Sequence, residues 1–377
     1  MRMLSKEEAK KLRTAIRRRL APWFEKNARD LPWRRTKDPY AIWISEIMLQ
    51  QTRVDTVIPY FQRFLARFPD VATLAAAPLQ DVLKLWEGLG YYSRARHIHA
   101  ASQILVRDFN GQLPENPEKL AQLPGLGPYT VAAIASFAFG QPLAVLDGNI
   151  MRIFTRWLAS NEDIGQQATK KKLQKVADTL LLRDKAALVN EAWMELGALI
   201  CTPRQPQCAI CPMRGVCRAF SLKKMEAFPK KRKKMSVPHK VVGAAVIVNR
   251  KNQFLIAQRH PEGGLLAGLW EFPGGKQAPG ETMPECIRRE LREEMGVNLD
   301  IGPHLVTVHH AYSHFTIELH AYFAKIRSGR PHHLDCADHA WVTREEFDSY
   351  PFSKADLEII RAIRQLPELP RWQSSGT

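Results

Sequence analysis

Four cysteines near the middle of the chain constrain its fold more than any other feature. Cys201, Cys208, Cys211 and Cys217 follow the spacing C-x6-C-x2-C-x5-C. Thiolates placed so closely suit a soft metal centre of iron or zinc. Six cysteines among 377 residues, four of them clustered, fit a reducing compartment and a metal site better than a disulfide framework. The loop therefore predicts a metal-bound end to the domain that precedes it.

Charge is divided unevenly along the chain. Residues 1–239 hold 39 Lys and Arg against 21 Asp and Glu, and residues 240–377 hold 16 against 17, so the formal charges are +18 and −1. A basic domain closed by a thiolate cage indicates a nucleic-acid partner. No apolar run approaches the ~20 residues that cross a bilayer, and the N-terminus lacks the apolar core of a secretory signal. We expect a cytoplasmic, nucleoid-associated protein with no membrane partner.

The chain length and a change of pattern predict two domains. Residues 1–222 are expected to form helices joined by short loops. A basic linker with two prolines is expected at 223–240, because a charge run with prolines rarely packs into a core. A mixed α/β domain follows at 241–368 and a tail at 369–377.

Hydrophobic periodicity predicts the elements of both domains. The helices expected in the first domain are at 6–27, 40–51, 53–67, 79–86, 93–108, 128–138, 149–158, 170–182 and 188–199. In the second domain we expect a hairpin of 241–248 with 253–258, a half-buried strand at 314–326, and helices at 283–295 and 354–365.

The segment LPGLGPYTVAAIA at 123–135 is typical of a helix–hairpin–helix turn. Gly125 and Gly127 are expected to adopt positive φ, and Pro128 suits the first turn of the following helix. Such a turn points N–H groups outward, which makes a DNA-binding phosphate site that ignores base sequence. A plain loop between two helices is the simpler interpretation of the glycine pair alone.

Several segments in order then resemble the endonuclease III superfamily of DNA glycosylases, and within it the MutY-type adenine DNA glycosylases. They are WISEIMLQQT (43–52), GLGYYSRAR (88–96), LPGLGPYT (123–130), VLDGNIMR (145–152), ELGALICT (195–202) and the cysteine loop (201–217). The resemblance covers residues ~6–220 and implies an all-α glycosylase domain with double-stranded DNA as its partner. It also implies a [4Fe–4S] cluster on the four cysteines, with a zinc cage as the alternative.

Two acidic residues in apolar surroundings suit the cleavage of an N-glycosidic bond, which needs a proton donor and a negative charge near the sugar cation. Glu46, in AIWISEIMLQ, is expected to be buried and protonated. Asp147, in AVLDGNI, is expected to stay ionised before a helix start, where an N-cap is the simpler role. The resemblance implies that Glu46 protonates adenine and that Asp147 stabilises the oxocarbenium ion.

Position 129 separates two subclasses of the superfamily. Bifunctional members carry a lysine there that forms a Schiff base, whereas this chain has Tyr129, so strand cleavage by β-elimination is expected to be absent or weak. A packing aromatic is also compatible with this position. A base inside the stack is out of reach, so we expect the target base to be flipped out. The resemblance implies that Gln51 and Tyr91 contact or wedge the base stack, with a plain surface or core position as the alternative, and that Arg34 and Glu191 lie in the adenine pocket.

The segment GKQAPGETMPECIRRELREEMGV, which begins at Gly275, satisfies the Nudix box at every fixed position. Glu290, Glu293 and Glu294 fall at i, i+3 and i+4 of one helix, where they are expected to hold Mg²⁺ at a diphosphate. A solvated acidic face, or an inherited metal site without activity, is the alternative.

MutY-type enzymes carry a Nudix-like C-terminal domain that reads 8-oxoguanine opposite adenine. Tyr312, Ser313 and His314 resemble the reading loop of that domain, where Ser313 would hydrogen-bond the altered edge of the purine. The Nudix box of the family is usually degraded, so the intact box of this chain leaves open whether its domain only recognises the lesion.

Together these features predict a monomeric, monofunctional adenine DNA glycosylase acting on adenine opposite 8-oxoguanine or guanine. One alternative is a Nudix pyrophosphatase on oxidised nucleoside triphosphates, supported by the intact box. A second is a bifunctional glycosylase/lyase on oxidised pyrimidines, which Tyr129 opposes. A third is a non-catalytic DNA-binding scaffold, which the pairing of Glu46 with Asp147 opposes.

Overall fold

The computed structural model describes residues 4–232, 237–262, 264–312 and 314–372. Its residues group into two compact units, one of Met1–Ala75 with Ala100–Lys233 and the other of Ala76–His99 with Lys234–Thr377. We call them the helical unit and the mixed unit. The domain limits expected from the sequence stay a prediction, because this grouping follows packing and not chain continuity. Part of the expected linker (233–236) and part of the expected tail (373–377) lie outside the described residues.

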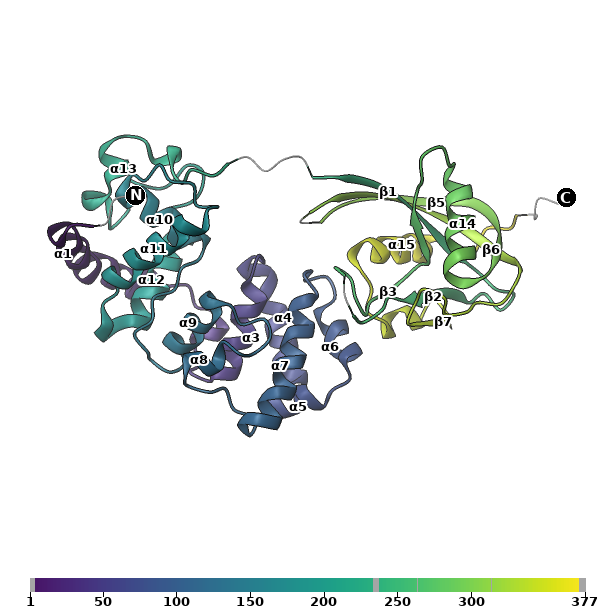
Figure 1. The fold of residues 1–377 in the computed structure, drawn as a ribbon, viewed down its shortest axis with the longest axis horizontal. Coiled ribbons are helices and arrows are strands. Elements are labelled where there is room, and N and C mark those ends of the chain that lie inside the picture. Colours follow the sequence, from purple (N-terminus) through teal and green to yellow (C-terminus); the bar gives the residue numbers. More distant parts are fainter. Residues whose placement is uncertain (1–3, 233–236, 263, 313, 373–377) are drawn as a thin grey trace. The chain divides into compact units, whose positions relative to one another are not determined.

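Helices build the first 232 residues of the chain (Figure 1). They are α1 (Lys6–Ala15), α2 (Ala21–Asn27), α3 (Pro39–Leu49), α4 (Val54–Arg67), α5 (Val71–Ala76), α6 (Leu79–Trp86), α7 (Ser93–Phe109), α8 (Pro117–Leu120), α9 (Pro128–Phe137), α10 (Gly148–Leu158), α11 (Gln167–Leu180), α12 (Ala186–Leu199) and α13 (Arg218–Ser221). A π-helical turn, η1 (Ile16–Leu20), joins α1 to α2, so the single helix expected at 6–27 is present.

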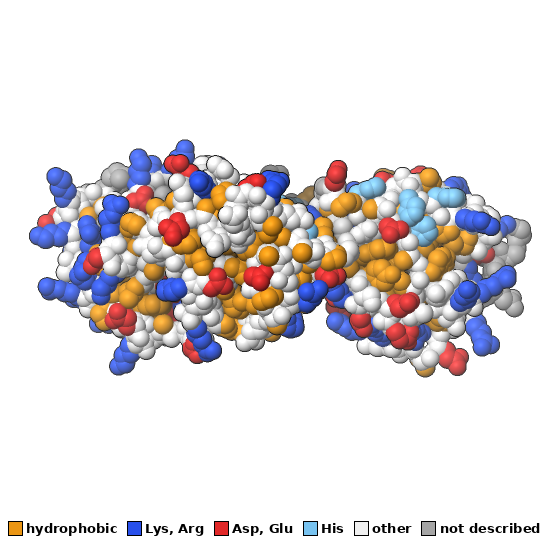
Figure 2. All heavy atoms as spheres, turned by 90° about the horizontal axis from the view of Figure 1, so that it is seen from below, with side chains coloured by type: hydrophobic (Ala, Val, Ile, Leu, Met, Phe, Trp, Pro, Cys, Tyr) orange, Lys and Arg blue, Asp and Glu red, His pale blue; other side chains and the backbone are white. Residues whose placement is uncertain are grey.

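Packing between α10 and α12 forms the centre of the helical unit. Phe154 of α10 meets Trp193 of α12 edge-on, with ring centroids 5.1 Å apart. Gly197 of α12 lets the two helices approach closely, because a Cβ at that position would lie 2.6 Å from Cβ of Asn149. This contact fixes the beginning of α10, where Asp147 is located. Lys and Arg side chains project from the surface of the helical elements (Figure 2), in line with the +18 formal charge of residues 1–239.

Strands and two helices build the part of the mixed unit that follows residue 236 (Figure 1). They are β1 (His239–Ile247), β2 (Phe254–Gln258), β3 (Trp270–Glu271), β4 (Gly274–Lys276), α14 (Met283–Met295), β5 (Asn298–Ala311), β6 (Thr316–Ser328), β7 (Asp338–Val342) and α15 (Lys354–Gln365). The same unit contains α6 and the beginning of α7. Lys84 of α6 donates from Nζ to the carbonyl of Tyr350 at 2.8 Å, and the Tyr92 hydroxyl donates to the carbonyl of Phe352 at 2.9 Å.

The strands form a four-stranded sheet of order β4-β1-β6-β5 and a three-stranded sheet of order β3-β2-β7. β1 and β6 are parallel, and β5 pairs with β6 as a long antiparallel hairpin. The hairpin predicted for 241–248 and 253–258 is wrong, because β1 and β2 belong to different sheets and share a single bridge between Val248 and Phe254. The expected division into a helical and a mixed α/β part is confirmed.

Both faces of the four-stranded sheet are covered. α14 packs on one face, where Ile287 lies so close to Gly243 that a Cβ at the glycine would be 2.6 Å from it. α15 contributes Ile359 to the apolar core on the other face, together with Phe323 of β6. No helix among the described residues is both long and apolar enough to span a bilayer.

Candidate active site

A cavity of about 1140 Å³ in the helical unit brings most of the predicted site residues together. Its lining comes from α3, α9, α10 and α12 and from the loops beside them. The predicted residues that line it are Arg34, Glu46, Gln51, Gly125, Gly127, Tyr129, Asp147 and Glu191. Tyr91 is not part of this lining. A hollow of this size admits a base that has left the helical stack.

Glu46 is carried into the interior by α3, a helix that is apolar on nearly every side. Asp38 caps this helix by accepting hydrogen bonds from the N–H groups of Tyr40 at 3.0 Å and Ala41 at 3.3 Å. Glu46 is only 4% exposed. Burial raises its pKa to about 7, while a hydrogen bond from Tyr129 acts in the opposite direction. A carboxyl group that holds its proton near neutral pH, as the sequence predicted, is able to donate it.

The Gly-x-Gly turn before α9 brings Tyr129 to Glu46. Gly125 has φ of 79°, which glycine adopts easily, but Gly127 has φ of −78° and ψ of 173°, so the prediction of positive φ at Gly127 is wrong. A Cβ at Gly127 would meet open space, so the glycine leaves the turn uncovered. Pro128 begins α9 as predicted. The Tyr129 hydroxyl donates to Oε2 of Glu46 at 2.8 Å.

Asp147 is the N-cap of α10 and also lines the cavity. Its carboxylate accepts hydrogen bonds from the N–H of Ile150 at 2.7 Å and from Nδ2 of Asn149 at 2.9 Å. Burial raises the pKa of Asp147 above its ordinary value, and these hydrogen bonds offset only part of that rise. The expectation of an ionised carboxylate at a helix start overlooked this burial. The charge of Asp147 in turn raises the pKa of Glu46. An ionised Asp147 thus favours a protonated Glu46.

A buried ion network beside the cavity escaped the sequence reasoning. Glu195 accepts hydrogen bonds from the N–H, Nε and Nη2 of Arg29 at 2.9, 2.8 and 2.9 Å, and from Nη2 of Arg34 at 3.0 Å. Arg34 also donates from Nε to Glu191 at 3.1 Å. Burial alone raises the pKa of Glu195, but the hydrogen bonds outweigh it and lower the pKa to about 2. The lone acid in the apolar segment AWMELGAL was the signal for Glu195.

Gln51 and Tyr91 both have left-handed backbones, with φ of 59° and 51°. Non-glycine residues rarely adopt this conformation, and those that do concentrate at functional sites. Gln51 lies beyond the end of α3 at the cavity. Tyr91 belongs to the mixed unit, where the guanidinium of Arg94 stands 5.3 Å from the centroid of its ring.

The four clustered cysteines follow α12, and none of the six cysteines of the chain forms a disulfide. Arg156 donates from Nη1 to Sγ of Cys201 at 3.2 Å. Burial raises the pKa of Cys211 to about 12 and that of Cys217 to about 11, and charge on the neighbouring thiols adds to both. Such thiols become thiolates when a metal centre takes up their negative charge.

The donor set of this loop is soft sulfur, which suits iron–sulfur chemistry. Among the described residues, no group of three Cys, His, Asp or Glu side chains is arranged to hold one metal ion.

The Nudix-box helix forms as predicted. α14 begins with a capping box of Thr282 and Glu285 and ends at Gly296, which has φ of 70°. The carboxylate of Glu290 lies over Gly275, since a Cβ there would be 2.1 Å from it, so a side chain at position 275 would displace that carboxylate. The Nudix box therefore accounts for the close contact between Gly275 and Glu290, whether or not its glutamates bind a metal ion.

Arg289 engages two of the three predicted magnesium ligands. It donates from Nη1 to Glu290 at 3.0 Å and to Glu293 at 3.2 Å. Glu294 is half-buried, and burial together with the charges of Glu271 and Glu290 raises its pKa to about 8. Magnesium at this box stays a prediction.

The predicted reading loop lies at the tip of the β5–β6 hairpin. The N–H of Tyr312 donates to the carbonyl of Phe315 at 2.8 Å, which closes the turn. The Tyr312 ring contacts His310 and Phe315, with centroid distances of 4.6 and 4.9 Å. His314 is exposed, and Ser313 lies outside the described residues.

Comparison with known families matches three parts of the chain. Residues 44–178 match the HhH-GPD superfamily of base excision DNA repair proteins. Residues 201–217 match the iron-sulfur binding domain of endonuclease III, so this loop is a [4Fe–4S] site. Residues 243–362 match the NUDIX domain.

Relatives extend the similarity beyond these segments. The adenine DNA glycosylase of Homo sapiens is 33% identical, covering 93% of this chain and 74% of the relative. That of Buchnera aphidicola subsp. Baizongia pistaciae is 38% identical, covering 67% of this chain and 71% of the relative. A solved thermostable thymine-DNA glycosylase shares 28% identity and a TM-score of 0.52, covering 57% of this chain and 98% of that one. On the strength of the human relative, which matches over 93% of this chain and 74% of its own length, the chain belongs to the adenine DNA glycosylase family.

Proposed function

We propose that this protein is a monofunctional DNA glycosylase that removes adenine mispaired with 8-oxoguanine or guanine during base excision repair. The observation that carries the proposal is the pairing of Glu46 and Asp147 in one cavity of a basic helical unit. Glu46 keeps its proton near neutral pH, and Asp147 has hydrogen-bond donors that support its ionised form. Two carboxyl groups held in different protonation states are what glycosidic cleavage requires.

Glu46 is assigned as the acid. Adenine is a poor leaving group as an anion, so a proton delivered to its ring lowers the barrier to departure. The pKa of the buried carboxyl is about 7, so at neutral pH a large fraction of it is protonated and the proton is readily transferred. The hydroxyl of Tyr129, 2.8 Å from Oε2, then stabilises the carboxylate that is left.

Asp147 is assigned to the sugar. When the base departs, positive charge develops on the ring oxygen and anomeric carbon, and a nearby carboxylate stabilises it. Its hydrogen bonds from Ile150 and Asn149 hold it in place, so little reorganisation accompanies the reaction. Water then bonds to the anomeric carbon and gives up one proton to a carboxylate of the cavity, which completes hydrolysis.

Tyr129 makes the enzyme monofunctional. A phenol cannot form an imine with the opened sugar, so the product is an abasic site and the strand stays intact. The bifunctional alternative on oxidised pyrimidines would need an amine at this position.

Contacts to DNA are assigned to the remaining residues of the cavity and its surroundings. Arg34, held by Glu191 and Glu195, lies where it can bind the flipped base. The uncapped start of α9, after Gly125 and Gly127, offers N–H groups to a phosphate. Gln51 and Tyr91 are assigned, each separately and as the sequence resemblance implies, to contacts with the base stack, and both have left-handed backbones.

The C-terminal part is assigned to lesion recognition through Tyr312, Ser313 and His314. The domain limits that we propose are 1–222, 223–240, 241–368 and 369–377. A monomer acting in the cytoplasm at the nucleoid accords with the basic charge and with six cysteines that form no disulfide. The cluster at residues 201–217 would hold this loop beside α12, and no catalytic step depends on it.

A second candidate activity is hydrolysis of nucleoside triphosphates at the Nudix box. The observation in its favour is the intact set of Glu290, Glu293 and Glu294 on α14. Arg289 competes with a metal ion for two of these carboxylates, so we rank this activity below base excision.

Substitution of the two carboxyl groups tests the proposal. Glu46→Gln and Asp147→Asn should each lower single-turnover adenine excision by at least ~100-fold and leave duplex affinity nearly unchanged. Glu118→Gln, an exposed substitution of the same kind, serves as the control. A wild-type excision rate in either variant would remove that residue from its role.

Lesion recognition needs a separate comparison. Ser313→Ala should reduce the ratio of excision rates opposite 8-oxoguanine and opposite guanine, while the rate opposite guanine stays the same. An unchanged ratio would move recognition away from this loop and would leave the excision chemistry untouched.

A further inference from the structure

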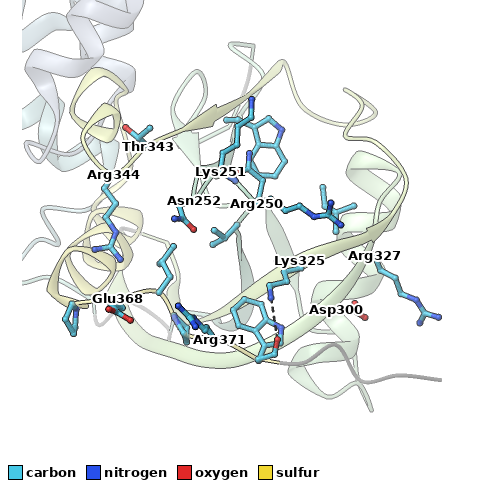
Figure 3. A pocket seen from close by; sticks show the side chains of 18 of the residues that line it. Arg250, Lys251, Asn252, Asp300, Lys325, Arg327, Thr343, Arg344, Glu368 and Arg371 are labelled. Carbon is cyan, nitrogen blue, oxygen red and sulfur yellow. Dashed lines mark hydrogen bonds between the residues drawn. The ribbon is translucent and has the colours of Figure 1, made fainter.

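A basic hollow of about 1380 Å³ on the mixed unit takes no part in the function proposed above (Figure 3). Its charged lining comprises Arg250, Lys251, Lys325, Arg327, Arg344 and Arg371, together with Asp300, Glu345 and Glu368. The hollow thus has a formal charge of +3, although residues 240–377 as a whole have a charge of −1. The hollow is thus much more positive than the rest of residues 240–377, and such a concentration of positive charge indicates an anionic ligand.

Two of the cations build one wall of the hollow. Lys325 donates from Nζ to the carbonyl of Trp372 at 3.4 Å and stands 4.4 Å above its ring. Arg344 donates from Nη1 to the carbonyl of Leu366 at 3.0 Å. The segment 366–372, of which residues 369–372 belong to the expected tail, is therefore held at both ends, by Arg344 beyond β7 and by Lys325 of β6. Gly302 leaves the space for this, because a Cβ there would lie 2.5 Å from the Trp372 ring.

Three other cations are left for a ligand. Arg250 and Lys251 lie in the turn between β1 and β2, which Asn249 rigidifies by accepting a hydrogen bond from the N–H of Lys251 at 2.8 Å. Arg371 belongs to the segment 366–372, on the side of the hollow opposite this turn. All three side chains are exposed, and within the described part of the chain no acidic group pairs with them. In Figure 3 Arg371 lies beside the hollow, whereas Arg327 extends away from it.

The chemistry of the hollow favours phosphate. Arginine forks bind phosphate oxygens in pairs, and Asn252 and Thr343 on the same lining add neutral donors. The polyanion that a basic glycosylase meets is DNA. Counter-ions released from phosphates would supply the binding free energy without any reading of base sequence.

The position of the hollow separates it from the reading loop. β6 begins at Thr316, next to that loop, and Arg327 near the other end of β6 borders the hollow. Eleven residues of strand span roughly 35 Å, which corresponds to about ten base pairs of DNA. Nucleotides that contact the loop therefore cannot fill the hollow at the same time.

We propose that this hollow binds the phosphate backbone of a DNA segment about one helical turn or more from the mispair. The site goes beyond the proposed function, since base excision does not require it. It keeps the enzyme on long DNA after the reading loop has released a site, because backbone contacts do not depend on sequence.

The test compares duplex lengths with a matched pair of triple variants. Arg250→Ala, Lys251→Ala and Arg371→Ala are combined in one protein, and Lys276→Ala, Arg288→Ala and Arg330→Ala, which lie outside the hollow, in the control. Affinity is measured from about 50 to 200 mM salt on duplexes of about 15 and 60 base pairs. Single-turnover excision on the short duplex is measured in parallel.

For the hollow variant on the long duplex, we expect the slope of log affinity against log salt to be shallower by up to about 2.7, or about 0.9 for each lost phosphate contact. Between about 50 and 200 mM salt, the loss of affinity should therefore be about 40-fold smaller for the hollow variant than for the wild type. Affinity and excision on the short duplex should match wild type. The charge-retaining variant Arg250→Lys with Arg371→Lys should keep the wild-type slope, which separates lost charge from misfolding.

Three outcomes would overturn the proposal. An unchanged slope on the long duplex would show that DNA does not occupy the hollow. An equal loss on the short duplex would place the contact beside the mispair. If a labelled poly-glutamate peptide bound the wild type but not the hollow variant, with no change in the DNA slope, the ligand would be an acidic protein segment. Loss of excision in all proteins would refute the glycosylase function and not this site.

Discussion

Replacing Tyr129 with phenylalanine tests the link between geometry and acid catalysis most sharply. The Tyr129 hydroxyl is 2.8 Å from Oε2 of Glu46 and supports the ionised form of that carboxyl, whose pKa is about 7. A hydrogen bond to a charged group contributes about 1.5–3 kcal/mol, and one pH unit corresponds to about 1.4 kcal/mol. The ionised form alone loses this bond in Tyr129→Phe, so the pKa of Glu46 should rise by about one to two pH units.

Single-turnover adenine excision as a function of pH is the assay. The rate should follow the protonated fraction of Glu46, with an inflection near pH 7 in the wild type and at about 8–9 in Tyr129→Phe. Tyr40→Phe is the matched control, since its buried hydroxyl donates to the carbonyl of Phe68 at 2.9 Å, away from Glu46. An inflection that stays in place or moves to lower pH in Tyr129→Phe would refute the assignment of Glu46 as the acid.

Three further predictions concern stability. The pKa of Glu46 rises from 4.5 to about 7 on folding, so the free energy of unfolding of the wild type falls as pH rises through this range. Glu46→Gln lacks this loss, so its free energy of unfolding relative to the wild type should increase by about 3 kcal/mol between pH 4.5 and 8, as measured by urea unfolding. Glu195→Gln breaks a buried network with two guanidinium groups and should cost about 3–5 kcal/mol by the same method; a cost below about 1 kcal/mol would contradict the network. Gly274→Ala puts a Cβ 2.1 Å from the carbonyl oxygen of Gly243, a backbone atom of β1 that cannot turn aside, and should lower the melting temperature of the mixed unit, seen as a separate calorimetric transition, by an amount matching about 1–3 kcal/mol; an unchanged transition would contradict the packing.

Most of the helices and the burial of Glu46 could be predicted from local sequence patterns. Helical periodicity located the long helices, and the apolar surroundings of Glu46 indicated the burial that raises its pKa. The Nudix-box helix and the strand at β6 followed from periodicity in the same way. These features depend on neighbours within a few turns of chain, which a single sequence displays.

Features that depend on distant partners could not be predicted. Glu195 meets Arg29 across 166 residues of sequence, and nothing local marks the pair. β5 escaped notice because Gly302 and a proline interrupt its alternation, with register shifts in the same stretch. β1 and β2 looked like a hairpin since a short polar turn joins them, but each pairs with strands far along the chain, β1 with β6 and β2 with β7.

The central claim is that the cavity removes adenine and leaves the strand intact. The most direct measurement is single-turnover incubation of the protein with a labelled duplex carrying adenine opposite 8-oxoguanine, resolved with and without alkali. The account predicts product only after alkali treatment, because an abasic site forms and Tyr129 cannot open it. Strand cleavage without alkali, or the absence of an abasic product, would contradict it.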